Sequence, residues 1–195
     1  MLTFTGVHIT KEFGAPTIRD IAVQSMRLVR FSGAAEVFWP IGMHMMLVAD
    51  LMPDEPWADV IALLHDAAEV AVADVPVPMK TDQARLVEQC VQERIHAALG
   101  VPAPSPELRA ELKKADLRAA LAEGALGCAG RGFQETQTGF AHDEVAERVL
   151  RKYLAQFNPM DALNADGRWA LMYERRLRKA LRKAQSGVVS YGLAA

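Results

Sequence analysis

The segment from Trp57 to Ala73, WADVIALLHDAAEVAVA, is apolar on nearly every side and yet carries charged side chains in its middle. A helix without a polar face belongs in the core, so this spacing predicts a helix at the centre of the fold. On a helical wheel of about 100° per residue, Asp66 lies about 100° and Glu69 about 40° from His65. All three side chains are therefore expected to point into one sector.

Charged side chains in a core helix need a compensating partner. Burying one ionised carboxylate alone costs several kcal/mol, and burying two costs more. A divalent cation meets this need, because neutral imidazole nitrogen and carboxylate oxygen are ligands that Mn, Fe, Co, Zn and Mg accept. The sequence therefore predicts a metal site on this helix. The alternative is that the helix is partly exposed and that its acidic side chains face solvent.

Two residues on neighbouring predicted helices fit the same site. His44 lies within the apolar stretch IGMHMMLVADLM, and Asp116 falls near the inward stripe of its helix. Taken alone, His44 is more often a hydrogen-bonded core histidine, and Asp116 could instead pair with Lys113 or Arg118. The order His…His-Asp…Asp on successive helices strengthens the metal interpretation.

The remaining sequence predicts an all-α fold in one domain. The chain has 195 residues, of which 51% are apolar and only 7% aromatic, while Gly and Pro separate the apolar segments. A short hairpin or irregular arm is expected over 1–15, and a flexible Gly-rich loop over 124–140. We predict helices over about 16–33, 40–53, 57–73, 83–99, 106–123, 142–157 and 165–185.

Charge and cysteine content exclude several classes of protein. The 22 Lys+Arg and 24 Asp+Glu residues give a net charge of −2, which argues against a nucleic-acid coat protein. Two cysteines suit a reducing cytoplasm, and Cys90 is expected in the core. Neither a signal peptide nor an apolar run of the ~18–20 residues that a membrane span needs is present. We therefore expect a cytoplasmic protein without a membrane partner.

Residues 62–80, ALLHDAAEVAVADVPVPMK, contain a His-Asp pair, then Glu, then Asp, then a Pro-x-Pro-x-Lys loop. This pattern resembles the HD-domain metal-dependent phosphohydrolases. It is most similar to the small bacterial 5′-deoxyribonucleotidases and the phage deoxyadenosine triphosphate triphosphohydrolases. The similarity covers about 17–123. It implies an HD-domain helical bundle over 1–195, with a C-terminal helical extension at about 141–185.

The resemblance implies roles for individual residues. It makes Glu69 and Asp74 acidic catalytic residues, and it makes Lys80 both a catalytic and a phosphate-binding residue. Without the preceding motif, Lys80 would instead be interpreted as an ordinary solvated lysine. It also implies that one divalent metal ion is held by His44, His65, Asp66 and Asp116. The sequence does not distinguish among Co, Mn, Mg, Zn and Fe.

The substrate-binding arginine is open between two positions. Arg30 ends the first predicted helix and matches an arginine that holds substrate phosphate. Phe31 follows it, however, where the family often has Trp, and a shifted alignment would place Arg27 there instead.

The implied activity is hydrolysis of a deoxynucleotide at its 5′ phosphate ester by a homo-oligomer. Asp116 lies 51 residues after His65, a short spacing that favours a deoxynucleoside triphosphate triphosphohydrolase over a 5′-deoxyribonucleotidase acting on monophosphates. Hydrolysis of a signalling nucleotide is a further alternative, against which the 74–80 loop argues.

A non-catalytic module is the alternative from another class. It would bind nucleotide or nucleic acid through the basic helix at 165–185. In the favoured interpretation this helix presents a solvated or interface face, and nucleic acid is not an expected partner. A second His-Asp pair, His142-Asp143, begins a predicted helix and is interpreted as a surface pair.

Overall fold

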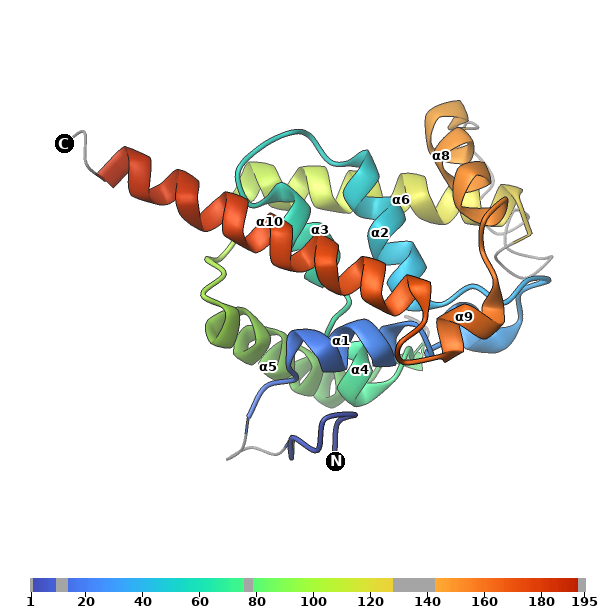
Figure 1. The fold of residues 1–195 in the computed structure, drawn as a ribbon, viewed down its shortest axis with the longest axis horizontal. Helices are drawn as coiled ribbons and strands as arrows, with labels where there is room; N and C mark the ends of the chain where they lie inside the picture. Colours follow the sequence, from blue (N-terminus) through green and yellow to red (C-terminus); the bar gives the residue numbers. More distant parts are fainter. Residues whose placement is uncertain (1, 10–13, 76–78, 128–142, 193–195) are drawn as a thin grey trace.

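The computed structural model shows an all-α protein in which the other helices pack around α2 and α3 (Figure 1). It describes residues 2–9, 14–75, 79–127 and 143–192. Within these ranges the extended pairing consists of isolated bridges, from Leu2 to His8 and from Val29 to Pro40. The elements are α1 (Ile18–Ser25), the 3₁₀ turn η1 (Arg30–Gly33), α2 (Ile41–Leu51), α3 (Ala58–Leu64), α4 (Glu69–Val72), α5 (Asp82–Leu99), α6 (Pro106–Ala125), α8 (Glu144–Leu154), α9 (Pro159–Leu163) and α10 (Arg168–Gly192).

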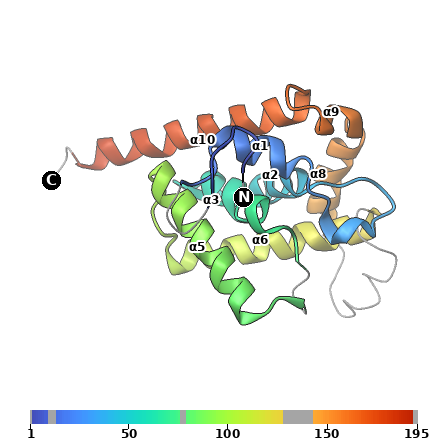
Figure 2. The same cartoon turned by 90° about the horizontal axis from the view of Figure 1, so that it is seen from below.

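The centre of the core is α2, which is buried continuously from Ile41 to Ala49. It packs against α3 and α6, and α10 covers α3 and α1 from the other side (Figure 2). The long α10 contributes Trp169, Tyr173 and Leu177 to the same apolar cluster. The C-terminal helix is therefore part of the core.

Local signals in the sequence set the start of several helices. The Thr17 side chain accepts from the backbone of Asp20, whose carboxylate accepts from Thr17 in return, so α1 begins with a capping box. Ser105 caps α6 with Pro106 in its first turn, in agreement with the predicted helix start at 106. The predicted helix between Pro40 and Pro53 is confirmed as α2.

The predicted helix over 16–33 is too long. Helix α1 ends at Ser25, and the chain then turns, so that Arg30 N–H donates to Trp39 O at 3.0 Å and Ile41 N–H donates to Leu28 O at 2.9 Å. The backbone of Phe31 adopts a positive φ of 55°, which a helix cannot accommodate. Pairing with the segment before α2 therefore replaces the last turns of the expected helix.

The predicted helix over 57–73 is broken into α3 and α4, with a turn over 65–68. The expected core position of Cys90 is also wrong, because Cys90 is exposed on α5, where Val87 is 46% exposed and Val91 is buried. Helix α5 contacts the body along a narrower stripe than its apolar residues suggest, since its buried residues are Val91 and Ile95.

Other predictions concern the second half of the chain. No helix was predicted at the position of α9. The predicted Gly-rich loop over 124–140 lies mostly outside the described residues, and so does His142. Asp143 caps α8 and pairs with Arg118, in keeping with a structural role. In the part of the chain that the structure describes, no helix combines the length and the apolarity needed to cross a bilayer.

Candidate metal site

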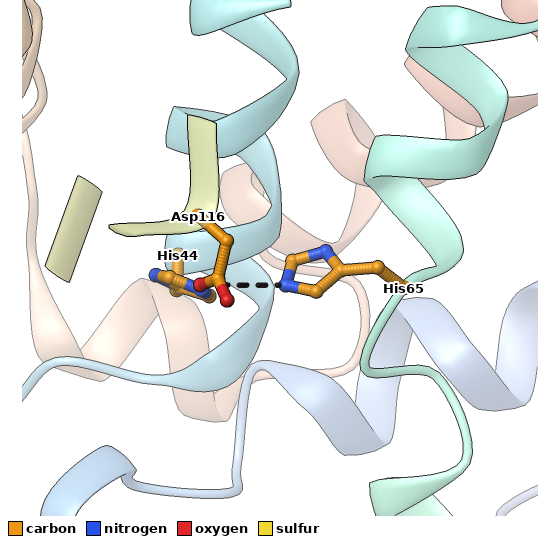
Figure 3. A group of neighbouring side chains, drawn as sticks. All are labelled: His44, His65 and Asp116. Atoms are coloured by element: carbon orange, nitrogen blue, oxygen red, sulfur yellow. Dashed lines mark hydrogen bonds and ion pairs between the residues drawn. The ribbon is translucent and has the colours of Figure 1, made fainter. Parts of the chain in front are cut away.

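His44, His65 and Asp116 converge on one point from three helices (Figure 3). His44 comes from the middle of α2, His65 from the end of α3 and Asp116 from α6. The Nε2 atom of His44 lies 3.0 Å from Oδ1 of Asp116, and Nε2 of His65 lies 4.0 Å from the same oxygen. One ligand atom from each residue lies within 4.8 Å of the others, so this group could hold a metal ion.

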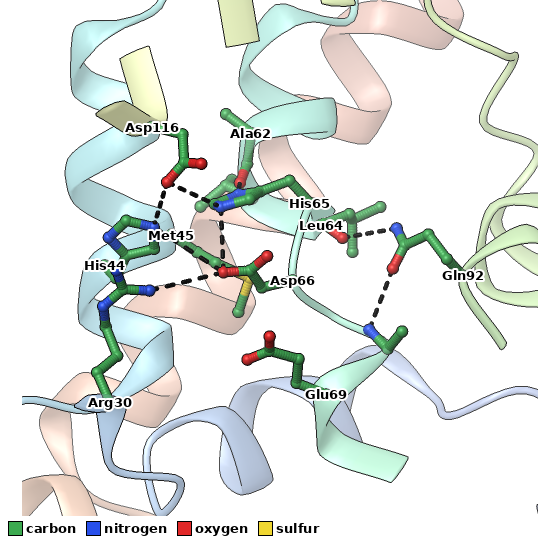
Figure 4. Close-up of polar contacts among 12 residues, drawn as sticks. Arg30, His44, Met45, Ala62, Leu64, His65, Asp66, Glu69, Gln92 and Asp116 are labelled. Atoms are coloured by element: carbon green, nitrogen blue, oxygen red, sulfur yellow. Dashed lines mark hydrogen bonds and ion pairs between the residues drawn. The ribbon is translucent and has the colours of Figure 1, made fainter. Parts of the chain in front are cut away.

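Asp66 lies beside this group of three (Figure 4). Its Oδ2 atom is 3.2 Å from Nε2 of His65 and 3.9 Å from Nε2 of His44. Neither of the partners considered for Asp116 contacts it, because Arg118 pairs with Asp143 and Lys113 is exposed. All four predicted ligands are therefore brought together, with Asp66 at the edge of the group.

The hydrogen bonds behind the two imidazoles orient their Nε2 atoms inward. Nδ1 of His65 lies 2.8 Å from the carbonyl oxygen of Ala62, and Nδ1 of His44 lies 2.7 Å from Oε1 of Glu123. Since these oxygens only accept, both Nδ1 atoms carry the proton. This arrangement is typical of metal-ligating histidines.

The donor set fits a divalent cation. The Nε2 atom of His65 is buried and has no hydrogen-bond partner of good geometry, although Oδ atoms of Asp66 and Asp116 lie within 4.0 Å. Two imidazole nitrogens and carboxylate oxygens are a set that Mn, Fe, Co and Zn accept. An orphaned nitrogen facing carboxylates is what a metal ion would satisfy.

The surrounding charges favour a cation. Burial alone would lower the pKa of His65, but Asp66 and Asp116 outweigh it and raise the pKa to about 9. The pKa of His44 is also raised, because Glu123 and Asp116 outweigh burial and the charge of Arg30. The carboxylates thus attract positive charge, which protons supply when no metal ion does.

Glu69 and Asp74 lie on the α4 side of the group. Burial, followed by the charges of Asp66 and Asp74, raises the pKa of Glu69 to about 9. Burial also raises the pKa of Asp74, although Arg30 opposes it and the carboxylate accepts a hydrogen bond from the Phe31 backbone. Both predicted acidic residues therefore have perturbed pKa values, as is common at functional sites.

Of the two candidate arginines, Arg30 lies at the site. Its Nη1 atom is 3.7 Å from Oδ2 of Asp66, and its Nε atom is 3.1 Å from Oε2 of Glu123. Arg27 points elsewhere: its Nε atom donates to Leu163 O, and its guanidinium lies over the Phe4 ring. The geometry therefore favours Arg30 over Arg27 for a role at this site.

Lys80 is not a solvated lysine. Its side chain is 11% exposed, and Nζ lies 2.7 Å from Oε2 of Glu88 and 3.7 Å from Oε1 of Glu69. Residues 76–78 of its loop lie outside the described residues. An adjoining cavity of about 360 Å³ is lined by residues that include His65, Lys80, Arg85, Glu88, Gln92 and His96. Lys80 therefore borders a space next to the candidate metal site.

Glu123 is a further member of the site that the sequence analysis missed. The side chain is completely buried and accepts hydrogen bonds from Trp39 Nε1 at 2.8 Å and from His44 Nδ1. It lies seven residues, or about two helical turns, after Asp116, and hence on the same face of α6. That spacing is the one sequence signal that could have found it.

Comparison with known proteins adds little to the site. No family model matches the chain. Over 123 residues it is 33% identical to YfdR of Escherichia coli (strain K12), a protein described only as uncharacterized. The match covers 59% of this chain and 65% of YfdR, so the chain spans somewhat less than two thirds of that relative.

Proposed function

We propose that this protein is a divalent-metal-dependent phosphohydrolase of the HD-domain superfamily that cleaves deoxynucleotides at the 5′ phosphate ester. The observation that carries the proposal is the convergence of His44 Nε2, His65 Nε2 and Asp116 Oδ1, with Asp66 beside them. The resemblance of residues 62–80 to HD-domain phosphohydrolases supports the same activity. By that resemblance we also propose a homo-oligomer, and from the cysteine content of the sequence we propose that it works in the cytoplasm.

A divalent ion held by the four ligands would supply Lewis-acid activation of a water molecule and neutralise phosphate charge. Arg30 lies beside Asp66 and Lys80 beside Glu69, and both cations are suited to bind non-bridging phosphate oxygens. Arg30 offers a planar fork of donors, whereas Lys80 offers a point charge. The main demand of phosphoryl transfer, charge stabilisation around phosphorus, is thereby met by side chains already in place.

The acidic side chains provide proton transfer. With a pKa of about 9, the Glu69 carboxyl group holds a proton at neutral pH, and Lys80 Nζ lies 3.7 Å from its Oε1 atom. Burial also raises the pKa of Asp74, and the charges of Arg30 and Lys80 oppose that rise. The protonated Glu69 carboxyl group can orient the attacking water by hydrogen bonding, and a carboxylate at Asp74 can accept the water's proton.

The proposed substrate is a deoxynucleoside triphosphate. Water attacks the α-phosphorus, the bond from phosphorus to O5′ breaks, and the deoxynucleoside leaves with a proton on O5′ while triphosphate is released. By the resemblance, the 51-residue spacing from His65 to Asp116 is nearer that of the phage triphosphohydrolases than that of the nucleotidases, which supports this substrate. Attack on a deoxynucleoside monophosphate, releasing orthophosphate, is the same step on a shorter substrate and is the second candidate.

A non-catalytic role based on the basic helix α10 has less support, because Arg176 and Arg178 in its middle are already paired. Arg176 contacts Asp50 at 2.8 Å and Asp59 at 2.7 Å, and Arg178 contacts Glu174 within its own helix. The Arg176 pairs join α10 to α2 and α3, which gives this side chain a structural role. The helix is better explained as a structural element whose basic residues bind neighbouring acidic ones.

The test is hydrolysis of a panel of deoxynucleotides with Mn²⁺, Co²⁺ or Mg²⁺, with chromatographic identification of the products. Triphosphate from a deoxynucleoside triphosphate would support the first candidate, and orthophosphate from a monophosphate the second. Asp66→Ala should abolish turnover, whereas Asp54→Ala, at a carboxylate that is 92% exposed, should not. Folded wild-type protein without turnover under any of these metals would overturn the proposal.

A further inference from the structure

The central helix is interrupted at the residues that would bind the metal. In an unbroken α-helix the Ala68 N–H would donate to the carbonyl oxygen of Leu64. The side-chain amide of Gln92, from α5, lies between these two groups instead (Figure 4). Its Nε2 atom donates to Leu64 O at 2.7 Å, and its Oε1 atom accepts from Ala68 N at 3.1 Å.

The backbone on either side of the amide is wound more tightly than an α-helix. Ala67 N–H donates to Leu64 O, and Glu69 N–H donates to Asp66 O, both at 3.0 Å. These bonds span three residues, as in a 3₁₀-helix. A side chain inserted into the hydrogen-bond ladder is a recognised cause of a helix break. Gln92 therefore has the position and the chemistry to cause the turn over 65–68.

The break matters for the two ligands that it contains. In a straight helix consecutive side chains point about 100° apart and do not face each other. Here Nε2 of His65 and Oδ2 of Asp66 lie 3.2 Å apart, the first 4.0 Å from Oδ1 of Asp116 and the second 3.9 Å from Nε2 of His44. This convergence requires the local departure from helical geometry that the turn provides.

Glutamine is well suited to this place because each of its polar hydrogens and its oxygen has a partner. One N–H donates to Leu64 O, and the other lies toward His96 Nε2, 2.8 Å from the Gln92 nitrogen. Burial lowers the pKa of His96, so its neutral ring can accept. Glutamate at position 92 would lack the donors, and leucine would lack both functions.

We propose that Gln92 is a positioning residue: its amide replaces the hydrogen bond between Leu64 and Ala68 and holds the turn that aims His65 and Asp66 at the metal site. The inference rests on the proposed metal site but does not depend on which nucleotide is hydrolysed. Gln92 itself touches neither a ligand atom of the group nor the proposed reacting atoms.

The test compares Gln92→Leu and Gln92→Glu with wild type. Gln89→Leu and Gln89→Glu are matched controls, because Gln89 lies on the same helix, is exposed and bonds to Glu93. Mn²⁺ affinity is measured by titration calorimetry. A through-hydrogen-bond NMR coupling from Ala68 N to the Leu64 carbonyl carbon reports whether the helix closes.

We expect Gln92→Leu to lower Mn²⁺ affinity by about 10–100-fold, the range typical when the orientation of metal ligands is disturbed. The Ala68–Leu64 coupling, absent in wild type, should appear, and the Gln89 variants should change neither quantity. Gln92→Glu keeps the acceptor for Ala68 and changes a single atom, so it provides the same test if Gln92→Leu does not fold. It should weaken Mn²⁺ binding through loss of the Leu64 contact.

Wild-type affinity for Mn²⁺ in a folded Gln92 variant would overturn the inference. Failure of wild type to bind Mn²⁺ would overturn both the inference and the metal site on which it rests. Wild type that binds Mn²⁺ but hydrolyses no nucleotide would overturn the proposed function alone, and loss of binding in the Gln92 variants would then still support the inference.

Discussion

Nδ1 of His44 lies 2.7 Å from Oε1 of Glu123, and both side chains are completely buried. The carboxylate accepts from this imidazole and from Trp39 Nε1, and its second oxygen faces Arg30 Nε at 3.1 Å. Burial alone would raise the pKa of Glu123, but Arg30 and His44 outweigh it and lower the pKa. The charged carboxylate thus fixes the ring of His44 with Nε2 toward Asp116.

Glu123→Gln should lower metal affinity by about 10–100-fold, because the neutral amide no longer fixes the His44 ring and presents N–H groups to the donors of Trp39 or Arg30. Mn²⁺ titration calorimetry measures the change. Glu111→Gln is the control, since Glu111 is on the same helix but 49% exposed. Unchanged affinity in a folded Glu123→Gln protein would contradict the role given to Glu123.

Metal affinity should rise with pH. The pKa of His65 is raised to about 9, so the free site binds protons that a metal ion must displace. Below pH 9 each proton released contributes about a tenfold gain in affinity per pH unit. Calorimetry between pH 6.5 and 8.5, in buffers of different ionisation enthalpy, gives the affinity and the proton count. Binding that is independent of pH and releases no proton would contradict this account.

Asp20 should make stability depend on pH in the acid range. Its buried carboxylate accepts from the backbone and hydroxyl groups of Thr5 and Thr17, at 2.7–2.9 Å. Burial alone would raise its pKa, but these bonds outweigh it and lower the pKa below 3.8. The stabilisation is therefore fully present above pH 3.8 and is lost as the pH falls through the lower, folded-state pKa.

Asp20→Asn should accordingly cost about 1–2 kcal/mol of unfolding free energy at pH 7. The difference from wild type should shrink below pH 3.8, when the wild-type carboxyl group is also neutral. Urea unfolding at pH 7 and at a pH below 3.8 measures the difference in unfolding free energy. Asp82→Asn, at an exposed site, is the control. A difference of the same size at both pH values would show that the charge of Asp20 is not what stabilises α1.

Lys80→Met should reduce hydrolysis by about 10²–10³-fold while Mn²⁺ affinity changes only a few-fold, because Lys80 is assigned to phosphate charge and not to the metal. Turnover and calorimetry together separate the two effects. Lys114→Met, at a lysine that is 66% exposed, is the control. A loss of metal binding equal to the loss of activity would place Lys80 in the metal site instead.

The sequence predicts those helices whose ends are set locally. Pro40 and the Ser105-Pro106 pair act on their own first turns, so α2 and α6 begin where the sequence indicates. The order of ligand residues was also visible, since each stands out within its own helix. The convergence of His44, His65 and Asp116 in space agrees with the prediction that these residues share one site.

Features imposed by distant residues were not predictable. The break after Leu64 depends on Gln92, which is polar and gives no sign in the sequence that it enters another helix. Glu123 depends on Trp39 and His44, which precede it by 84 and 79 residues. The end of α1 is set by pairing with the segment before α2. In each case a tertiary contact overrides a local pattern.

The hydroxyl group of Tyr173, in α10, donates to the carbonyl oxygen of Leu63, 110 residues earlier and two positions before His65. During synthesis every candidate ligand therefore leaves the ribosome well before the helix that covers them. Until α10 has been synthesised, the nascent chain exposes the apolar sides of α1 and α3 to water and is prone to aggregate. A fragment ending near residue 123 would carry all the ligands and still lack the surface that holds them in order.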